Sequence, residues 1–438
     1  MEEWIKITLY LCMFAFFRDF RPVDSFYTAY LSSPAVNFTS EQISEDIYPV
    51  NAYSCTSVTI IIFLITDFFR YKPIVVLDAL CSMLIYIMVM KPITLLKVQI
   101  AMGLTGLSSA TELAYSSYIY AKIRNRALYQ KMTGFIRGSY LMGKCLSAAV
   151  SQILVSYSEK KYDLLVYLSL AGSTSAFIFS FLLPRVKASI YFYPEVPSSN
   201  RKQCNYKTLE NLSLKDSCEY FNTPETATSI RVVLQQLYSE LKDTFYNPYL
   251  LKYSIWTGIA GGVYFQVMTY KDVFYNDLNK SDPVNNKLYN GAVDSLAFIT
   301  GAFSTYCLGF LNLQWKRISN LYFFIGCMFC CIVLSLTYLT TSLNLIYLMY
   351  ILYTIIYQSM FTIARSETAK YLQHDSFAFI IGLNYFFELC MSSLFTFVIV
   401  QGSIFVLPTN TQFLVYGMIY GGLAIWFLVN LFISYDIY

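Results

Sequence analysis

Five charged residues lie inside stretches of sequence that are otherwise apolar enough to cross a membrane. A charged side chain at the centre of a bilayer costs roughly 2.5–3.5 kcal/mol on insertion scales, so such residues usually face a water-filled cavity. A cavity of this kind serves the passage of a polar solute, and we therefore predict a transporter. The five residues are Asp24, Glu112, Lys144, Asp294 and Glu388.

Polar residues accompany these charges at spacings of three or four, which place them on one face of a helix. The plainer alternative is that the polar groups pair across helices and lock the bundle together. Because the carboxylates outnumber the cations, we expect an acidic cavity that suits an organic cation. The stripes are Thr105, Ser108, Glu112 and Tyr115; Asn290 and Asp294; and Asn384, Glu388 and Ser392.

The cations in these stretches have two possible roles. Arg21 and Asp24 are three residues apart with Pro22 between them, which predicts an irregular backbone and either a structural ion pair or charges lining a vestibule. Lys144 either neutralises one of the acids or contacts the solute. In the short loop after the second span, Asp67 and Arg70 have the position expected of gating charges, although such charges can also serve orientation alone.

Composition supports a membrane protein, because 56% of the 438 residues are hydrophobic and only 13% are charged. A span needs about 20 mainly apolar residues. We predict twelve transmembrane helices in an all-α polytopic fold. They lie near 7–29, 50–66, 74–91, 97–121, 134–156, 163–183, 249–270, 290–312, 319–338, 343–363, 377–400 and 412–433.

A polar segment divides the predicted spans into two sets of six. Residues 185–247 are rich in polar residues and end in an amphipathic stretch near 230–245, which predicts a cytosolic linker. The linker separates an N-terminal six-helix bundle, 1–184, from a C-terminal one, 248–438. Two such bundles around a central path are typical of the major facilitator fold.

The loops predict an orientation and exclude several classes of function. Lysine and arginine concentrate in the loops on the side of both termini, which places the termini in the cytoplasm and explains the net charge of +4 without nucleic acid. Asn37 and Asn279 then lie outside in glycosylation sequons. No nucleophile with a base, metal cluster or cofactor motif is found, so we predict a carrier in the lipid bilayer rather than an enzyme.

Seven short motifs recur in order along the chain. They are Arg21-Pro22-Val23-Asp24-Ser25-Phe26, Glu45 to Val50, Thr66 to Pro73, Ala110 to Tyr120, Tyr129-Gln130-Lys131, Gln152 to Ser156, and Tyr289 to Asp294. Together they resemble the reduced folate carrier and thiamine transporter family (solute carrier family 19). The resemblance covers nearly all of the predicted spans and implies a multi-pass plasma-membrane carrier of major facilitator fold that moves a water-soluble vitamin.

The resemblance also implies which vitamin is carried. An acid at Glu112, where the folate carriers have an arginine, is typical of the thiamine transporters, and Asp24, Tyr86 and Asn290 match their contacts. We therefore predict a thiamine-like cation carried by alternating access, with Tyr115 and Glu388 as further contacts.

Four positions depart from both patterns of the family. They leave open another vitamin or a phosphorylated derivative as the cargo, beside two further alternatives, which are a reduced folate carrier and a membrane receptor or scaffold that does not transport. The four are Asn51, Met102, Thr105 and Lys144.

Overall fold

The computed structural model is helical, with no strand in the residues that it describes, which are 3–122, 126–157, 161–186, 191–193, 229–283, 286–309, 315–371, 377–401 and 407–435. Twelve helices of 17 residues or more follow the order of the twelve predicted spans. They are α1 (Glu3–Asp19), α3 (Tyr48–Phe68), α4 (Lys72–Val89), α5 (Leu95–Lys122), α6 (Arg126–Tyr157), α7 (Lys161–Leu182), α9 (Pro248–Ser281), α10 (Asn290–Gly309), α11 (Trp315–Leu339), α12 (Leu343–Tyr371), α13 (Phe377–Phe395) and α14 (Thr409–Tyr435).

Seven of these helices are long and apolar enough, by length and composition alone, to cross a membrane. The other five, α1, α5, α6, α9 and α10, carry several of the charged residues that mark the candidate site. This is the pattern expected of a polytopic protein whose polar helix faces are turned away from lipid. The seven are Gln42–Phe68, Lys72–Val89, Tyr162–Leu182, Ile318–Leu339, Leu343–Thr368, Phe379–Val400 and Thr409–Phe432.

The first span is broken, as the sequence predicts. Helix α1 ends at Asp19, and the chain resumes as the 3-10 turn η1 (Asp24–Phe26) and the short helix α2 (Tyr27–Leu31). Pro22 lies in the break, where its missing N–H cannot continue the helical hydrogen bonds. The break turns Asp24 away from the regular helical path. A π-helical turn, η2 (Gln42–Ile47), leads into α3, and another, η3 (Thr396–Val400), extends α13.

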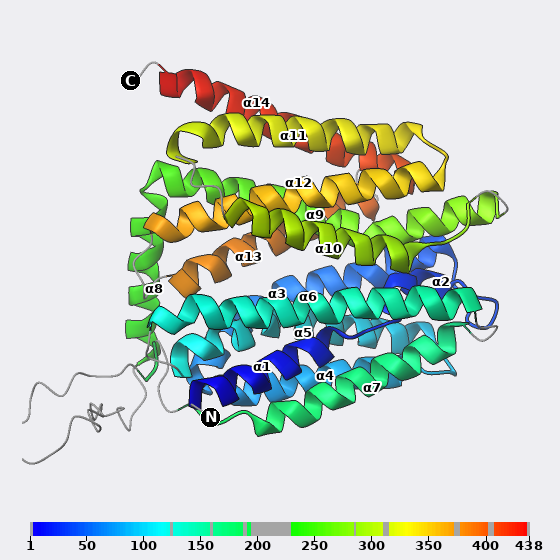
Figure 1. Cartoon of the computed structure of the whole chain (residues 1–438), viewed down its shortest axis with the longest axis horizontal. Coiled ribbons are helices and arrows are strands. Elements are labelled where there is room, and N and C mark those ends of the chain that lie inside the picture. Colours follow the sequence, from blue (N-terminus) through cyan, green and yellow to red (C-terminus); the bar gives the residue numbers. More distant parts are fainter. Residues whose placement is uncertain are drawn as a thin grey trace, which may run out of the picture.

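The helices before and after the predicted linker pack mainly among themselves. In the first half α1 packs on α6 and α7, α5 packs on α3 and α4, and α4 packs on α7. In the second half α9 packs on α12 and α13, α11 packs on α12 and α14, and α10 packs on α12. The two halves meet where α6 contacts α10, α3 contacts α13 and α2 contacts α9. Figure 1 shows the first half below the second, with the long helices roughly aligned.

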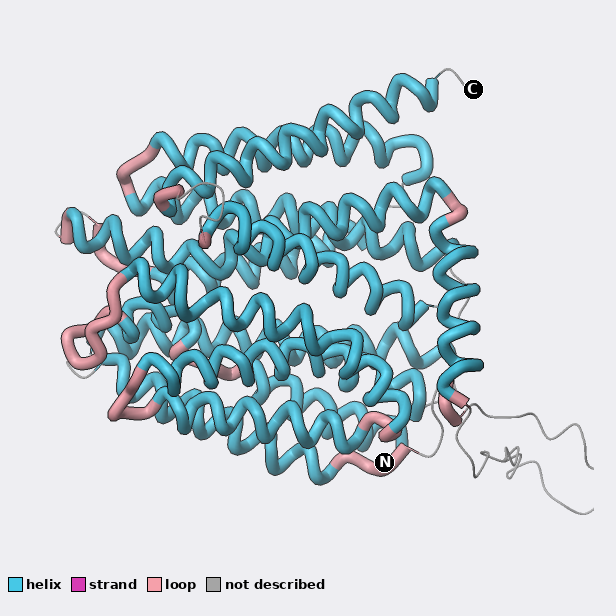
Figure 2. Tube along the Cα trace, turned by 180° about the vertical axis from the view of Figure 1, so that it is seen from behind, coloured by secondary structure: helices cyan, strands magenta, loops and turns pink. Residues whose placement is uncertain are grey.

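Both termini lie at one end of the helices, together with α8 (Ile230–Phe245), which crosses that end (Figures 1 and 2). We call this the terminal end and the opposite one the far end. Helix α8 occupies the stretch predicted to be amphipathic. Its Val233 and Leu237 are buried, whereas Leu234 and Tyr238 are exposed. The greater part of the predicted linker, residues 194–228, lies outside the described residues.

The far end is closed by hydrogen bonds between the two halves. The Ser40 hydroxyl donates to Asp277 Oδ1 at 2.5 Å, and Asn276 Nδ2 donates to Ser32 Oγ at 3.1 Å. Nearby, the Tyr53 hydroxyl donates to Gln401 Oε1 at 2.5 Å. An apolar cluster that contains residues of both halves lies in the same region. These contacts must separate if the far end is to open.

Candidate functional site

Asp24 lies at the break in the first span and is exposed, although its neighbours Val23 and Ser25 are buried. Its Oδ1 accepts a hydrogen bond from the hydroxyl of Tyr86, a buried residue of α4, at 3.2 Å. Two of the predicted contacts, Asp24 and Tyr86, are therefore adjacent in space although 62 residues separate them.

The surroundings of Asp24 come from both halves of the chain. It interacts electrostatically with Arg21, with Lys144 of α6 and with Asp272 of α9. An exposed carboxylate whose charged neighbours come from several helices faces space between those helices rather than lipid. We therefore place the candidate site at the first-span break, between α4, α6 and α9.

A buried ion-pair network lies beside this site in the first half. Arg18 Nε is 2.6 Å from Asp78 Oδ2, and its Nη1 is 3.3 Å from Asp19 Oδ2. Its Nη2 donates to the backbone carbonyl of Ser108 at 3.0 Å, and the Ser108 hydroxyl donates to Asp78 Oδ1 at 2.6 Å. Because these four side chains are at most 5% exposed, the network joins α1, α4 and α5 in the interior.

Arg21 forms its ion pair with Asp19 rather than with Asp24, the partner expected from the sequence. Arg21 Nη2 lies 3.9 Å from Asp19 Oδ1, and its Nε donates to the carbonyl of Arg18 at 2.7 Å. The reason is the broken backbone, because residues three apart share a face only while the helix continues. Asp24 keeps the Tyr86 hydroxyl as its hydrogen-bond partner.

A second buried network lies in the second half and includes two predicted residues, Asn290 and Asp294. Lys271 Nζ is 2.9 Å from Asp294 Oδ1 and 3.2 Å from Asp272 Oδ1. Asn290 Nδ2 donates to Asp272 Oδ1 at 3.0 Å, and its Oδ1 accepts from the Tyr347 hydroxyl at 2.7 Å. Asp294 thus forms an ion pair with Lys271 of α9. This is the arrangement predicted by the alternative that the polar groups pair across helices.

Two other predicted charges lie apart from these networks. Lys144 Nζ lies over the rings of Tyr140 and Phe298, at 4.7 and 5.7 Å from their centroids. Glu388 is buried against α9, where a Cβ on Gly261 would come within 2.5 Å of its Cγ. Within the described part of the chain Glu388 has no hydrogen bond or ion pair, and its electrostatic neighbour is Arg365.

Two predicted contacts cannot be placed at the level of side chains. Glu112 and Tyr115 belong to α5, whose backbone is described, but their side chains lie outside the described residues. Their roles stay predictions from the sequence.

The predicted gating residues Asp67 and Arg70 lie at the terminal end, where they hold a segment of the linker. Asp67 Oδ2 accepts from the backbone N–H groups of Tyr191 and Phe192, at 2.9 and 2.8 Å, and Oδ1 accepts from the Tyr71 hydroxyl at 2.9 Å. The Arg70 guanidinium lies 4.0 Å from the centre of the Tyr193 ring. Tyr191 and Phe192 pack in an apolar cluster with α8, Phe63 and Phe379, so Asp67 anchors the linker where both halves meet.

Replacing Asp67 by alanine is expected to destabilise the terminal end. The change leaves two buried backbone N–H groups without an acceptor, at roughly 1–3 kcal/mol for each group. The melting temperature of the purified protein should fall clearly more for Asp67→Ala than for Asp163→Ala. Asp163 pairs with Lys91 at 2.8 Å on the surface, and such pairs contribute about 0–1 kcal/mol. Equal melting temperatures for the two variants would contradict the anchoring role.

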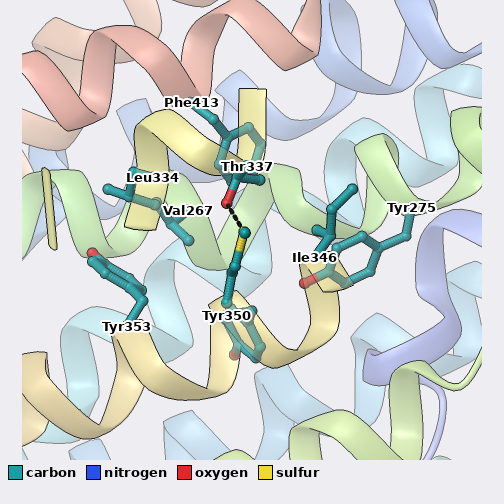
Figure 3. Close-up of a pocket in the computed structure, with 9 residues that line it drawn as sticks. Val267, Tyr275, Leu334, Thr337, Ile346, Tyr350, Tyr353 and Phe413 are labelled. Carbon is teal, nitrogen blue, oxygen red and sulfur yellow. Dashed lines mark hydrogen bonds between the residues drawn. The ribbon is translucent and has the colours of Figure 1, made fainter. Parts of the chain in front are cut away.

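A small cavity in the second half contains none of the predicted site residues. It has room for about one water molecule, far less than a small-molecule site needs. The Thr337 hydroxyl, labelled in Figure 3, donates the hydrogen bond drawn there as a dashed line, and its acceptor is the sulfur of Met349 at 3.6 Å. We regard it as a packing void. Its lining is Val267, Tyr275, Leu334, Thr337, Ile346, Met349, Tyr350, Tyr353 and Phe413.

Reasoning from the sequence missed the partners in both networks. Arg18, Asp19 and Asp78 lie in predicted spans, so the signal used for the other charges, a charge in an apolar stretch, was present for them too. Lys271 and Asp272 follow directly after the predicted end of the seventh span at residue 270, but α9 continues to Ser281 and carries them inside.

Known sequences resemble this chain over nearly its whole length. The sequence profile described as reduced folate carrier matches residues 2–415. Thiamine transporter 2 of Mus musculus is 29% identical over 450 residues, covering 98% of this chain and 90% of the relative. The reduced folate transporter of Homo sapiens is 29% identical over 426 residues, covering 95% of this chain and 70% of the relative.

Solved structures resemble the fold. The crystal structure of a D-xylose–proton symporter superimposes with a TM-score of 0.67 at 10% identity, covering 97% of each chain. At this identity the likeness concerns the fold alone. It confirms the major facilitator fold that the span count and the resemblance predicted.

Proposed function

The chain belongs to the reduced folate carrier family, and from this premise we propose that it is a plasma-membrane transporter of a thiamine-like organic cation. The observation that carries the choice of cargo is the exposed Asp24 carboxylate between the two halves. A carboxylate in that position attracts a positively charged solute, and the low dielectric of the surrounding helices strengthens the attraction.

The charges around the candidate site favour a cation. Among the described residues, the two networks together with Asp24, Arg21 and Lys144 contain five carboxylates and four cations. Glu112 would add to the negative charge from α5. A dianionic folate would meet this excess as repulsion, whereas a monocation would relieve it. The positive residues are Arg18, Arg21, Lys144 and Lys271, and the acids are Asp19, Asp24, Asp78, Asp272 and Asp294.

The proposed mechanism is alternating access between two six-helix bundles, 1–184 and 248–438, joined by the linker 185–247. We assign the far end to the outside and both termini to the cytoplasm, because the loops at the terminal end carry most of the lysine and arginine. The solute contacts Asp24 and Tyr86 in the first bundle and Asn290 in the second. Rocking of the bundles then breaks the far-end hydrogen bonds and opens the site outward, and the solute crosses chemically unchanged.

Reduced folate is the second candidate cargo. Two observations favour it, the cations Arg21 and Lys144 near Asp24 and the identity of 29% to the human reduced folate transporter, which equals that to the thiamine transporter. An anionic solute would use these cations as its counter-charges.

Uptake measurements test the proposal. Cells that express the chain are offered radiolabelled thiamine or a radiolabelled reduced folate, and surface delivery is measured by labelling intact cells. We expect saturable thiamine uptake above that of untransfected cells. Uptake of folate alone would move the assignment to the second candidate, and uptake of neither solute at normal surface delivery would favour a receptor or scaffold.

Of the two predicted glycosylation sites, Asn37 and Asn279, we expect only Asn37 to carry a glycan. Asn37 is exposed in the far-end loop, where a glycan can project from the surface. Asn279 lies in α9, and its Nδ2 donates to the carbonyl of Asn286 at 2.7 Å, so its amide nitrogen is already engaged. Glycosidase treatment should shift the electrophoretic mobility of wild type and Asn279→Gln but not that of Asn37→Gln. A shift that persists in Asn37→Gln would contradict the assignment.

A further inference from the structure

Asp272 occupies a position on α9 that faces the first half of the chain. Residues four apart in a helix share a face, so Asp272 lies one turn from Asn276 on the same side. Asn276 donates to Ser32 of the first half at 3.1 Å. Asp272 is therefore one turn inward of a contact between the two halves, on the surface that the halves share.

The two oxygens of the Asp272 carboxylate are used unequally. Oδ1 accepts from Lys271 Nζ at 3.2 Å and from Asn290 Nδ2 at 3.0 Å. Oδ2 has no partner among the described residues, although only 12% of the side chain is exposed. Oδ2 is not among the fully enclosed unpartnered atoms of the described residues, so a donor from outside the protein can reach it. It is thus a vacant acceptor for a donor or cation that the protein does not supply.

Asp24 is near enough to Asp272 for the two carboxylates to interact across the halves. Both also interact with Tyr48, whose hydroxyl lies 2.6 Å from that of Thr28. The turn η1, which contains Asp24, also contacts α10, the helix that begins with Asn290. Asp24 is contributed by the first half and Asp272 by the second.

Lys271 neutralises the second-half acids only in part. The single ammonium group is shared between Asp272 and Asp294, so one negative charge remains in this network. Arg21 and Lys144 attract Asp24 electrostatically. Without a bound solute, the two facing carboxylates repel each other across the halves.

We infer that Asp24 and Asp272 form a two-sided cation site, in which each half of the transporter contributes one carboxylate to the positively charged group of the solute. The inference rests on the proposed function and adds a second-half contact that Asn290 orients. A cation between the two acids replaces repulsion by attraction, so binding favours the conformations in which both halves surround it. A ligand changes a conformational equilibrium only through such a difference in affinity.

The first experiment measures thiamine uptake and thiamine-induced stabilisation of the full-length chain. For Asp272→Asn we expect KM for thiamine to rise at least tenfold with little change in maximal rate per transporter at the surface. We also expect the rise in melting temperature caused by thiamine to disappear, because a ligand stabilises only the state that binds it. Asp272→Glu should restore part of both effects. The surface variant Asp163→Asn serves as the matched control.

Unchanged KM and unchanged thiamine stabilisation in Asp272→Asn would overturn the inference. So would a variant that melts earlier without thiamine but keeps the wild-type KM, because Asp272 would then act only in packing.

A second experiment tests the pair without any solute. Because the two acids repel each other, we expect Asp24→Asn to raise the melting temperature of the wild-type protein. The same change should raise the melting temperature of the Asp272→Asn variant less. Additive effects of the two changes would overturn the pairing. If wild type neither takes up thiamine nor is stabilised by it, the proposed function fails, while this melting comparison still decides whether the two carboxylates face each other.

Discussion

Thiamine uptake by the Asp24→Asn variant is expected to fall by about 10- to 100-fold at low solute concentration. Asparagine keeps the size of the side chain and its contact with the Tyr86 hydroxyl but removes the charge. A hydrogen bond to a charged group is worth roughly 1.5–3 kcal/mol, and each 1.4 kcal/mol corresponds to about a factor of ten. The measurement is the initial rate of uptake of radiolabelled thiamine, divided by the amount of transporter at the cell surface.

Tyr86→Phe provides the graded comparison for this result. It removes only the hydroxyl that donates to Asp24 at 3.2 Å and keeps the negative charge, so the loss should be a few-fold at most. A larger loss of uptake in Asp24→Asn than in Tyr86→Phe would show that the negative charge contributes more than the hydrogen bond does. Uptake by Asp24→Asn at the wild-type rate would remove Asp24 from the solute site and, with it, the charge argument for a cation.

Loss of the folded transporter is the expected effect of Arg18→Leu. The substitution leaves Asp78, which is 1% exposed, without the guanidinium that lies 2.6 Å away. Removing one partner of a buried ion pair typically costs about 3–5 kcal/mol, because the other charge stays buried and unpaired. The purified variant should melt well below wild type, and much less of it should reach the cell surface.

A double variant distinguishes the charge imbalance from the loss of packing. The double variant Arg18→Leu/Asp78→Leu also removes the buried carboxylate. Replacing both partners of a buried ion pair by apolar side chains often changes the stability of the fold little. Asp19 keeps Arg21 at 3.9 Å. We therefore expect the double variant to recover part of the lost melting temperature. A double variant as unstable as the single one would assign the effect to the shape of the Arg18 side chain.

The two buried networks and the two-sided site have different roles in transport. The Arg18 network joins α1, α4 and α5 within the first half, and the Lys271 network joins α9 and α10 within the second. Pairs within one half can persist while the halves rock. Asp24 and Asp272, in contrast, act on each other across the halves, so their interaction changes when the halves move. This difference is why a solute bound between them can bias the conformation.

The sequence by itself determined the helical elements and several of the functional positions. The span positions follow from the length of apolar stretches, because a helix of about 20 residues satisfies its own backbone hydrogen bonds in lipid. The break near Pro22 and the helix at 230–245 follow from equally local signals, a missing N–H and an amphipathic period. Charge in an apolar stretch marked Asp24 and Asp294 before any partner was known.

Only the tertiary structure decided which of these charges are paired and which are open. Asp294 and Asp24 give the same signal in the sequence, yet Lys271 lies 2.9 Å from Asp294, whereas Asp24 is exposed between the halves. Arg18 and Asp78 are 60 residues apart and meet because α1 and α4 both pack on α7 in the first half. Such pairings depend on how helices pack over long separations in the chain, and periodicity along one helix carries no information about the residue that faces it from another.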